Sequence, residues 1–175
     1  MNNVGRAVDD SFSYFEQGIE RMARRVEGMP VDHVVLKRLF VFTYQQMQDS
    51  YNAFLSQFGL NDNTFLALVL IYNNPEGQLN PCELSNRLIS SRANVTRFSD
   101  ELVNAGWVER KASTEDRRRV ELSLTPAGQT LVEAVLPKVW ERLVQQWGVL
   151  DEGEMKELNR LLRKLLAGQA KVDAS

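Results

Sequence analysis

The sequence is poor in the residues from which most catalytic and metal sites are built. Its 175 residues include one cysteine, Cys82, and one histidine, His33. A single cysteine excludes an intrachain disulfide framework and favours a reducing, cytoplasmic setting. A single histidine at the start of a predicted helix is typical of a surface cap region. The chain also lacks a nucleophile motif, a Gly-rich phosphate loop and a metal-ligand cluster, so we expect no enzyme, cofactor or metal.

Long hydrophobic runs are absent too. No apolar stretch approaches the roughly 20 residues that cross a bilayer, and the polar start MNNVGRAVDD does not resemble a secretory signal. With 43% apolar residues, the chain suits one domain with a sizeable core. We therefore expect a cytoplasmic protein without a membrane partner.

The chain also lacks a strong excess of positive charge, since its formal net charge is −2. This argues against binding to nucleic acid. The charges are, however, unevenly distributed. Between Leu84 and Arg119 eight cations face five anions, whereas the remaining 13 cations and 18 anions leave the rest of the chain acidic. A local basic face on an acidic body still attracts phosphate at short range.

Helical patterns fill the first third of the chain. One apolar stripe recurs at spacings of four and three, and indicates either a helix packed on its own core or an arm that reaches a partner subunit (Val8, Phe12, Phe15, Ile19, Met22, Val26). Gly28 and Pro30 should end it. A longer helix is expected over 32–58 with Gly59 as its cap, and the apolar run NTFLALVLIYN predicts a deeply buried third helix from Asn61 or Asp62.

The stretch from Leu79 to Leu124 predicts a helix-turn-helix followed by a two-stranded hairpin. Asn80, Pro81 and Glu83 suit the cap, first position and capping box of a short helix. Ile89-Ser90-Ser91 is the expected turn, with a serine capping the second helix. In that helix the predicted buried stripe is Val95, Phe98 and Leu102.

The opposite side of this second helix presents polar side chains near its N-terminal end, the end that a recognition helix inserts into the major groove. Arginine can bond guanine bidentately, asparagine can do so with adenine, and threonine can reach a base. An ordinary solvated face is the alternative. The candidate DNA-binding residues here are Ser91, Arg92, Asn94, Thr96 and Arg97.

Gly106 should end the recognition helix, and strands are expected over 107–111 and 120–124. The tip between them, ASTEDRRR, suits a narrow minor groove, where the potential is most negative. We assign Arg117 and Arg118 to DNA contact and Asp116 to orienting an arginine. A merely soluble loop, the alternative, explains three consecutive arginines poorly.

Two apolar helices follow, one from Thr125-Pro126 to about Gln146 with a kink expected at Pro137, and one opened by Asp151. They are too apolar for solvent, which indicates a dimer interface.

We thus predict a mainly α (α+β) fold with four parts. N-terminal dimerisation helices cover 1–58, a winged helix-turn-helix lobe 60–124, C-terminal dimerisation helices 125–168 and a flexible tail 169–175.

These residues resemble the MarR family of winged helix-turn-helix regulators. The resemblance rests on SSRANVTRFSDELVNAGWVERKASTEDRRRVELSLTPAG, and its ordered matches include Thr96, Arg97, Asp100, Leu102, Gly106, Trp107, Asp116, Arg118, Leu124, Thr125 and Gly128. It covers about residues 32–167. Within the family the chain looks most similar to the EmrR/MprA type of multidrug-efflux repressor.

The resemblance implies a homodimer that represses a promoter and is released when a small, often phenolic, effector binds between the dimer helices and the DNA-binding lobe. Candidate effector contacts near that junction are Phe40, Tyr44, Met47, Tyr51 and Phe65, for each of which plain core packing is the alternative. Some family members sense oxidants through a cysteine in the first helices, but those helices contain none here. We expect Cys82 to be a small, half-buried filler.

We therefore predict a ligand-responsive, dimeric repressor whose partners are double-stranded DNA, a second copy of itself and a small effector. A winged-helix module that binds proteins instead of DNA is the alternative. Exposed arginines on both helix and wing argue against it, because a protein partner would not require them on both.

Overall fold

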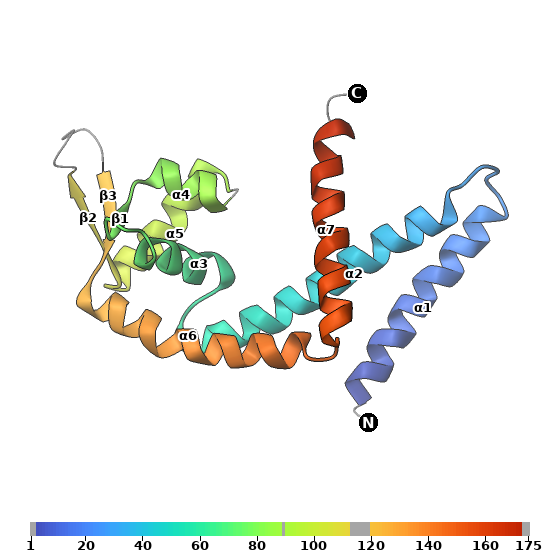
Figure 1. The fold of residues 1–175 in the computed structure, drawn as a ribbon, viewed down its shortest axis with the longest axis horizontal. Coiled ribbons are helices and arrows are strands. Elements are labelled where there is room, and N and C mark those ends of the chain that lie inside the picture. Colours follow the sequence, from blue (N-terminus) through green and yellow to red (C-terminus); the bar gives the residue numbers. More distant parts are fainter. Residues whose placement is uncertain (1–2, 89, 113–119, 173–175) are drawn as a thin grey trace. The chain divides into compact units, whose positions relative to one another are not determined.

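The computed structural model describes residues 3–88, 90–112 and 120–172, with side chains described for 12–88, 90–112 and 120–169. The chain is mainly helical, as predicted (Figure 1), and divides into two compact units, Met1–Phe65 and Leu66–Ser175. The helices are α1 (Asn3–Ala23), α2 (Val31–Leu55), η1 (Ser56–Phe58), α3 (Asp62–Tyr72), α4 (Pro81–Leu88), α5 (Arg92–Asn104), α6 (Pro126–Trp147) and α7 (Glu152–Val172). The strands are β1 (Gln78–Leu79), β2 (Val108–Ala112) and β3 (Val120–Leu124).

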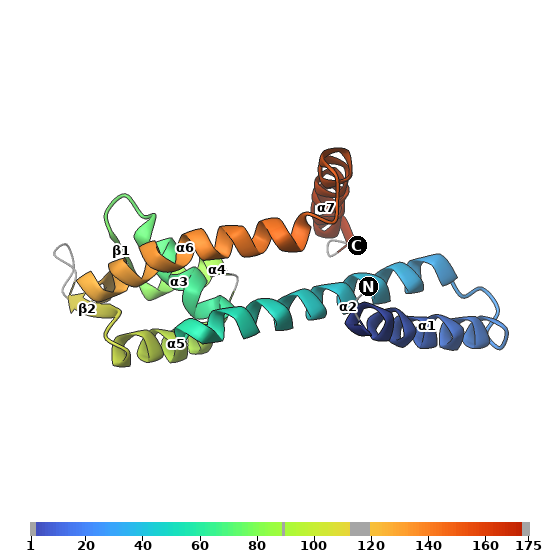
Figure 2. The ribbon, with the colours of Figure 1, turned by 90° about the horizontal axis from the view of Figure 1, so that it is seen from below.

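In the first unit α1 and α2 form an antiparallel hairpin (Figures 1 and 2). Phe12 and Ile19 of the predicted stripe are buried, and the Phe12 ring lies 5.8 Å from that of Phe42. Phe15 and Met22 of the same stripe are exposed. The stripe therefore covers its own helical partner only in part.

Gly59 ends this helical run as predicted, with a left-handed φ of +73° directly after η1. The next helix begins with reciprocal bonds: the Thr64 N–H donates to Asn61 Oδ1 (3.1 Å), and the Asn61 N–H donates to Thr64 Oγ1 (2.9 Å). In α3 Ala67, Leu68 and Ile71 are fully buried, but Leu66 and Tyr72 are exposed. The helix is therefore not buried on all sides as its composition indicated.

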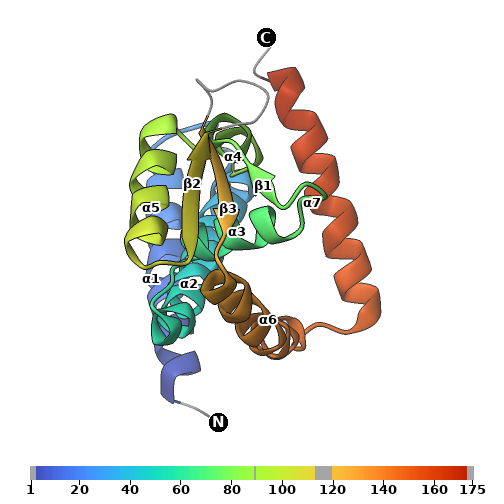
Figure 3. The same ribbon diagram turned by 90° about the vertical axis from the view of Figure 1, so that its left-hand side faces the viewer.

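The sheet of the second unit contains a strand that the sequence did not reveal. The order is β1–β3–β2, antiparallel throughout (Figure 3). The β2–β3 hairpin runs from Val108 opposite Leu124 to Ala112 opposite Val120, as expected. Strand β1 adds two residues, too short a segment for a period-two pattern to be recognised.

One core unites the elements of this unit. Its fully or almost fully buried members come from α4, α5, the sheet and α6 (Leu79, Leu84, Val95, Phe98, Leu102, Val108, Leu122, Val132, Val135, Val139). The α4 and α5 helices pack on each other, and α5 packs on β2. The recognition helix predicted from the sequence is thus held through its apolar face.

The junction between hairpin and α6 is held by Thr125. Its Oγ1 donates to the Gly106 carbonyl (2.7 Å) and accepts from the Gly128 N–H (3.1 Å), while its own N–H donates to the Trp107 carbonyl (3.0 Å). Gly106 has a φ of +75°, which favours glycine. Thr125 therefore caps α6 and ties its start to the end of the α5 region.

Helix α6 continues through Pro137 to Trp147. Asp151 then opens α7 with a capping box, because the Glu154 N–H donates to Asp151 Oδ1 and the Asp151 N–H donates to Glu154 Oε2 (both 2.9 Å). Helix α7 reaches Val172, into the segment expected to be a tail.

Among the described residues no single helix is long and apolar enough to cross a membrane, and only α2, η1 and α3 taken together across a bend reach that length and hydropathy.

We predict that Gly128→Ala destabilises the fold strongly. A Cβ at this position would lie 2.0 Å from the Trp107 carbonyl oxygen, and neither backbone can yield without breaking the Thr125 bonds. Such overpacking costs about 3 kcal/mol, or roughly 10 °C in Tm for a domain of this size. Thermal unfolding followed by circular dichroism measures the effect. Gly168→Ala in α7, where a Cβ meets nothing within 4 Å, is the control and should leave Tm unchanged or slightly raised; equal behaviour of the two variants would refute the steric argument.

Candidate nucleic-acid interface

The first helix of the motif, α4, is fixed by its own N-terminal sequence. The Glu83 N–H donates to Asn80 Oδ1 (2.9 Å) and the Asn80 N–H donates to Glu83 Oε2 (3.3 Å), which is the predicted capping box. Pro81 occupies the first helical position. Leu84 is fully buried and Leu88 half-buried, so the helix is anchored on its inner side.

A short turn connects α4 to the recognition helix. The Ser85 hydroxyl donates to the Ser90 carbonyl (2.6 Å), and the Ser90 N–H donates back to the Ser85 carbonyl (3.1 Å). Ser91 then caps α5 as predicted, because its Oγ accepts from the Asn94 N–H (3.3 Å). Ile89 lies outside the described residues. Hydrogen bonds thus tie the turn to α4 on one side and cap α5 on the other.

Helix α5 has a buried apolar face and an exposed polar face. Val95, Phe98 and Leu102 are at most 1% exposed, which confirms the predicted buried stripe. All five predicted contact residues are exposed, and they share the first turns of the helix (Ser91, Arg92, Asn94, Thr96, Arg97). The structure thus brings together, on one solvent-facing surface, donors and acceptors suited to base edges.

Two ion pairs involve this helix. The Arg97 guanidinium bonds the carboxylate of Glu101 (2.8 Å) one turn later. The guanidinium of Arg110 on β2 bonds the carboxylate of Asp100 (2.6 Å), which connects recognition helix and wing strand. Sequence reasoning missed the second pair, because its partners are ten residues apart on different elements and share no local pattern.

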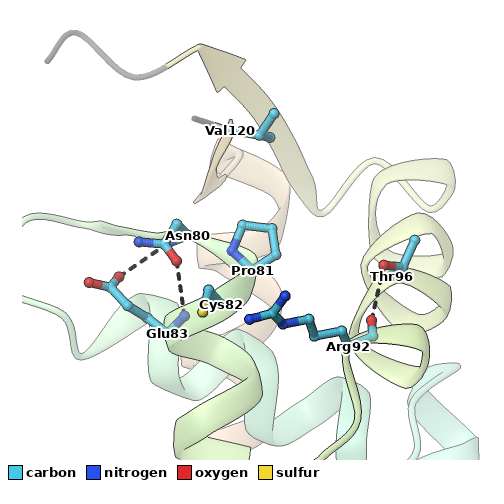
Figure 4. Close-up of a pocket in the computed structure, with 7 residues that line it drawn as sticks. All are labelled: Asn80, Pro81, Cys82, Glu83, Arg92, Thr96 and Val120. Carbon is cyan, nitrogen blue, oxygen red and sulfur yellow. Dashed lines mark hydrogen bonds between the residues drawn. The ribbon is translucent and has the colours of Figure 1, made fainter. Parts of the chain in front are cut away.

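A groove of about 560 Å³ lies beside the polar face (Figure 4), lined by the residue that precedes α4 and by residues of α4, α5 and β3 (Asn80, Pro81, Cys82, Glu83, Arg92, Thr96, Val120). Figure 4 shows Arg92 extending from α5 toward Pro81 and Cys82 of α4. Cys82 is exposed, so the prediction of a half-buried filler was wrong. In the first turn of α4, Leu84 faces the core, whereas the Cys82 thiol lines this groove.

The wing residues predicted to touch DNA, Asp116, Arg117 and Arg118, lie outside the described residues. The hairpin that carries them is described up to Ala112 and from Val120. At its base the Lys111 ammonium bonds Glu109 (2.6 Å) and holds the pKa of that carboxyl below its usual range. Because Arg110 and Lys111 are both paired, they offer less free positive charge than the sequence alone suggests.

Four of the five candidate effector residues lie on α2 at helical spacing, and Phe65 lies on α3. Phe40 and Tyr44 of α2 are 56% and 55% exposed, Met47 and Tyr51 are half-buried, and Phe65 is buried. Burial and the nearby Asp62 carboxylate raise the pKa of Tyr51 to about 12, so its phenol stays neutral. A cavity of about 220 Å³ in the same unit is lined by other residues of α1 and α2, which sequence reasoning did not assign to an effector (Phe12, Phe15, Arg38, Val41, Phe42, Gln45).

Two short capped helices, a turn and a β-hairpin packed on one core define a winged helix-turn-helix lobe. The family model described as "MarR family" matches residues 60–120. The chain is 36% identical to the transcriptional repressor MprA of Escherichia coli, over 91% of each chain. It is 30% identical to the HTH-type transcriptional regulator PrsX of the same species, over 87% of this chain and 92% of that one.

Solved structures agree with this match. A mutant MarR from Escherichia coli in complex with operator DNA superposes with a TM-score of 0.70 at 29% identity, covering 80% of this chain and 99% of that one. AbsC from Streptomyces coelicolor, described as a MarR family transcriptional regulator, has the same fold with a TM-score of 0.71 at 20% identity, over 78% and 93%. The chain belongs to the MarR family of transcriptional regulators.

Proposed function

We propose that this chain is a dimeric, DNA-binding transcriptional repressor that a small lipophilic or phenolic effector releases from its operator. The observation that carries the proposal is the exposed polar face at the N-terminal end of α5, mounted on a fully buried stripe. Such a face can enter the major groove while α4 and the wing contact the backbone. The DNA-bound MarR with which the chain superposes supports the same role.

DNA readout is assigned to two sets of residues. Arg92, Asn94, Thr96 and Arg97 bond base edges, with Ser91 at the phosphate backbone. Arg117 and Arg118 enter the adjacent minor groove, and Asp116 orients one of them. These roles follow the exposure of the α5 residues and, for the wing, the sequence alone.

A second copy of the chain is the partner that the apolar surface of the terminal helices favours. In α6 the exposed fractions of Trp140 and Val144 are 58% and 72%, and in α7 those of Leu165 and Leu166 are 62% and 77%. Large apolar side chains in such numbers are unfavourable in water and are typical of protein contacts. Two-fold symmetry then predicts a pseudo-palindromic operator with half-sites roughly 10 bp apart.

The effector is assigned to the aromatic stretch of α2 and to Phe65. Two aromatic side chains are exposed there, beside the half-buried Met47 and Tyr51, an arrangement that suits a flat apolar molecule. The neutral phenol of Tyr51 can donate a hydrogen bond to it. Efflux genes or genes for aromatic-compound stress are the targets that such a signal fits.

Arg97→Ala should weaken binding to the preferred duplex by about 1–3 kcal/mol and relax preference at one base position. Arg118→Ala should weaken binding to every sequence and reduce the slope of log K against log salt by about one. Fluorescence anisotropy on selected and random duplexes at two salt concentrations measures both. Arg160→Ala on α7, another exposed arginine paired within its helix, is the control; wild-type affinity in both test variants would overturn the DNA-binding assignment.

Leu166→Glu should convert the dimer into a monomer, because it places a charge in the apolar surface of α7. Sedimentation velocity gives the mass, and the same sample should lose most of its affinity for a two-half-site duplex. Lys164→Ala, two residues away on the same helix, should keep the dimer. A wild-type chain that sediments as a monomer would refute the dimer assignment.

A matching effector should raise Tm by roughly 5–10 °C at 100 times its Kd, since binding adds about 2.7 kcal/mol of stability at that concentration. Phenols, fatty acids and lipophilic drugs are the panel for this thermal-shift assay. Tyr44→Ala should reduce the shift, whereas Tyr14→Ala, also an exposed tyrosine, should not. A shift lost only in the Tyr14 variant would contradict the assignment to α2 and Phe65 and favour the cavity that α1 forms with α2.

A further inference from the structure

The ion pair between Arg97 and Glu101 is arranged against the electrostatics of its helix. The positive end of a helix dipole lies at the N-terminus, so a cation early and an anion late in a helix are both unfavourable. Pairs in which Glu precedes the cation are better. Three other helical pairs follow the better order (Glu20–Arg24, Glu152–Lys156, Glu157–Arg160).

Helix stability therefore does not explain why Arg97 comes first. The order is explained if Arg97 must lie in the N-terminal half of α5, the half assigned to the major groove. Glu101 then stands one turn farther along the helix, bonded to the Arg97 guanidinium at 2.8 Å. Both side chains are largely exposed, 63% and 44%, so the pair is open to competition from DNA.

The neighbouring contact residues are not held in this way. Within the described residues the side chains of Arg92 and Asn94 have no ion-pair or hydrogen-bond partner, and Thr96 bonds only the Arg92 carbonyl (3.0 Å). Among the four predicted base-contacting side chains of α5, Arg97 is thus the one whose donors are already engaged by a carboxylate.

We infer that Glu101 is a positioning residue that acts through Arg97 and sets the discrimination between operator and random DNA. The inference rests on the proposed DNA-binding function. Bidentate bonding to guanine offers Arg97 two good acceptors in fixed geometry and can replace the carboxylate. A phosphate or a mismatched base offers less, so Arg97 stays with Glu101 and its charge remains neutralised on random DNA.

Glu101→Gln should therefore tighten binding to random duplex about fivefold and leave binding to the preferred duplex within twofold of wild type. The probes are a random-sequence duplex pool and the duplex that repeated selection on the wild-type dimer enriches from it, both followed by fluorescence anisotropy. Glu157→Gln, which breaks a comparable exposed pair on α7, is the control and should change neither affinity. Thermal unfolding checks that each variant is folded.

The double variant Glu101→Gln with Arg97→Ala separates positioning from simple charge removal. If Glu101 acts through Arg97, the gain on random duplex should shrink to less than twofold in the Arg97→Ala background. An undiminished fivefold gain there would overturn the inference, as would an unchanged ratio of the two affinities in the single variant or the same change in Glu157→Gln.

Repeated selection on Glu101→Gln provides a readout that a merely structural role would not move. Preference should relax at the base position that Arg97→Ala also relaxes and persist elsewhere, whereas general loosening of α5 would relax all positions and contradict the inference. Wild-type protein that binds neither duplex would refute the proposed function itself. Wild-type discrimination with no effect of Glu101→Gln would refute only the positioning role.

Discussion

The close approach of Gly128 to Trp107 is the constraint on which the winged lobe depends. Gly106 and Trp107, which follow α5, meet Gly128 at the start of α6 here. Thr125, between β3 and α6, bonds a backbone group of each of these three residues. A side chain at Gly128 would collide with the Trp107 backbone, so this close approach of α6 to the end of the α5 region requires glycine. The direction of the wing relative to the recognition helix is therefore set by backbone contacts, with the exposed Asp100–Arg110 pair adding a weaker link.

The features that could be predicted from the sequence are those whose interactions are local. Asn80 with Glu83 and Ser91 with Asn94 span three residues, and the Val95, Phe98 and Leu102 stripe spans two turns. Each of these helix signals lies within a short segment of sequence, so the helix-turn-helix and its exposed polar face could be predicted from the sequence alone. Gly106 and Gly59 end their helices for an equally local reason, a positive φ.

What could not be predicted depends on pairing across the chain. Strand β1 exists because Gln78 and Leu79 lie opposite Ser123 and Leu122, and no alternation within two residues reveals this. The same holds for Asp100 and Arg110. Cys82 was misplaced because a small residue one position after Pro81 fits either side of a helix until the packing of Leu84 fixes which side faces inward.

The charge pattern explains how an acidic chain can serve a DNA-binding role without binding indiscriminately. Three cations of α5 and β2, Arg97, Arg110 and Lys111, are each bonded to a carboxylate within 2.8 Å. Pairs this exposed contribute little to stability, yet each removes positive charge from the surface that phosphates meet. Non-specific affinity for DNA rises with the number of phosphates that the protein neutralises. Pairing of cations with carboxylates therefore lowers non-specific affinity more than it lowers bonding to base edges, because base-edge bonds depend on the geometry of donors and acceptors. The proposed specificity of the lobe therefore depends as much on where its anions lie as on its arginines.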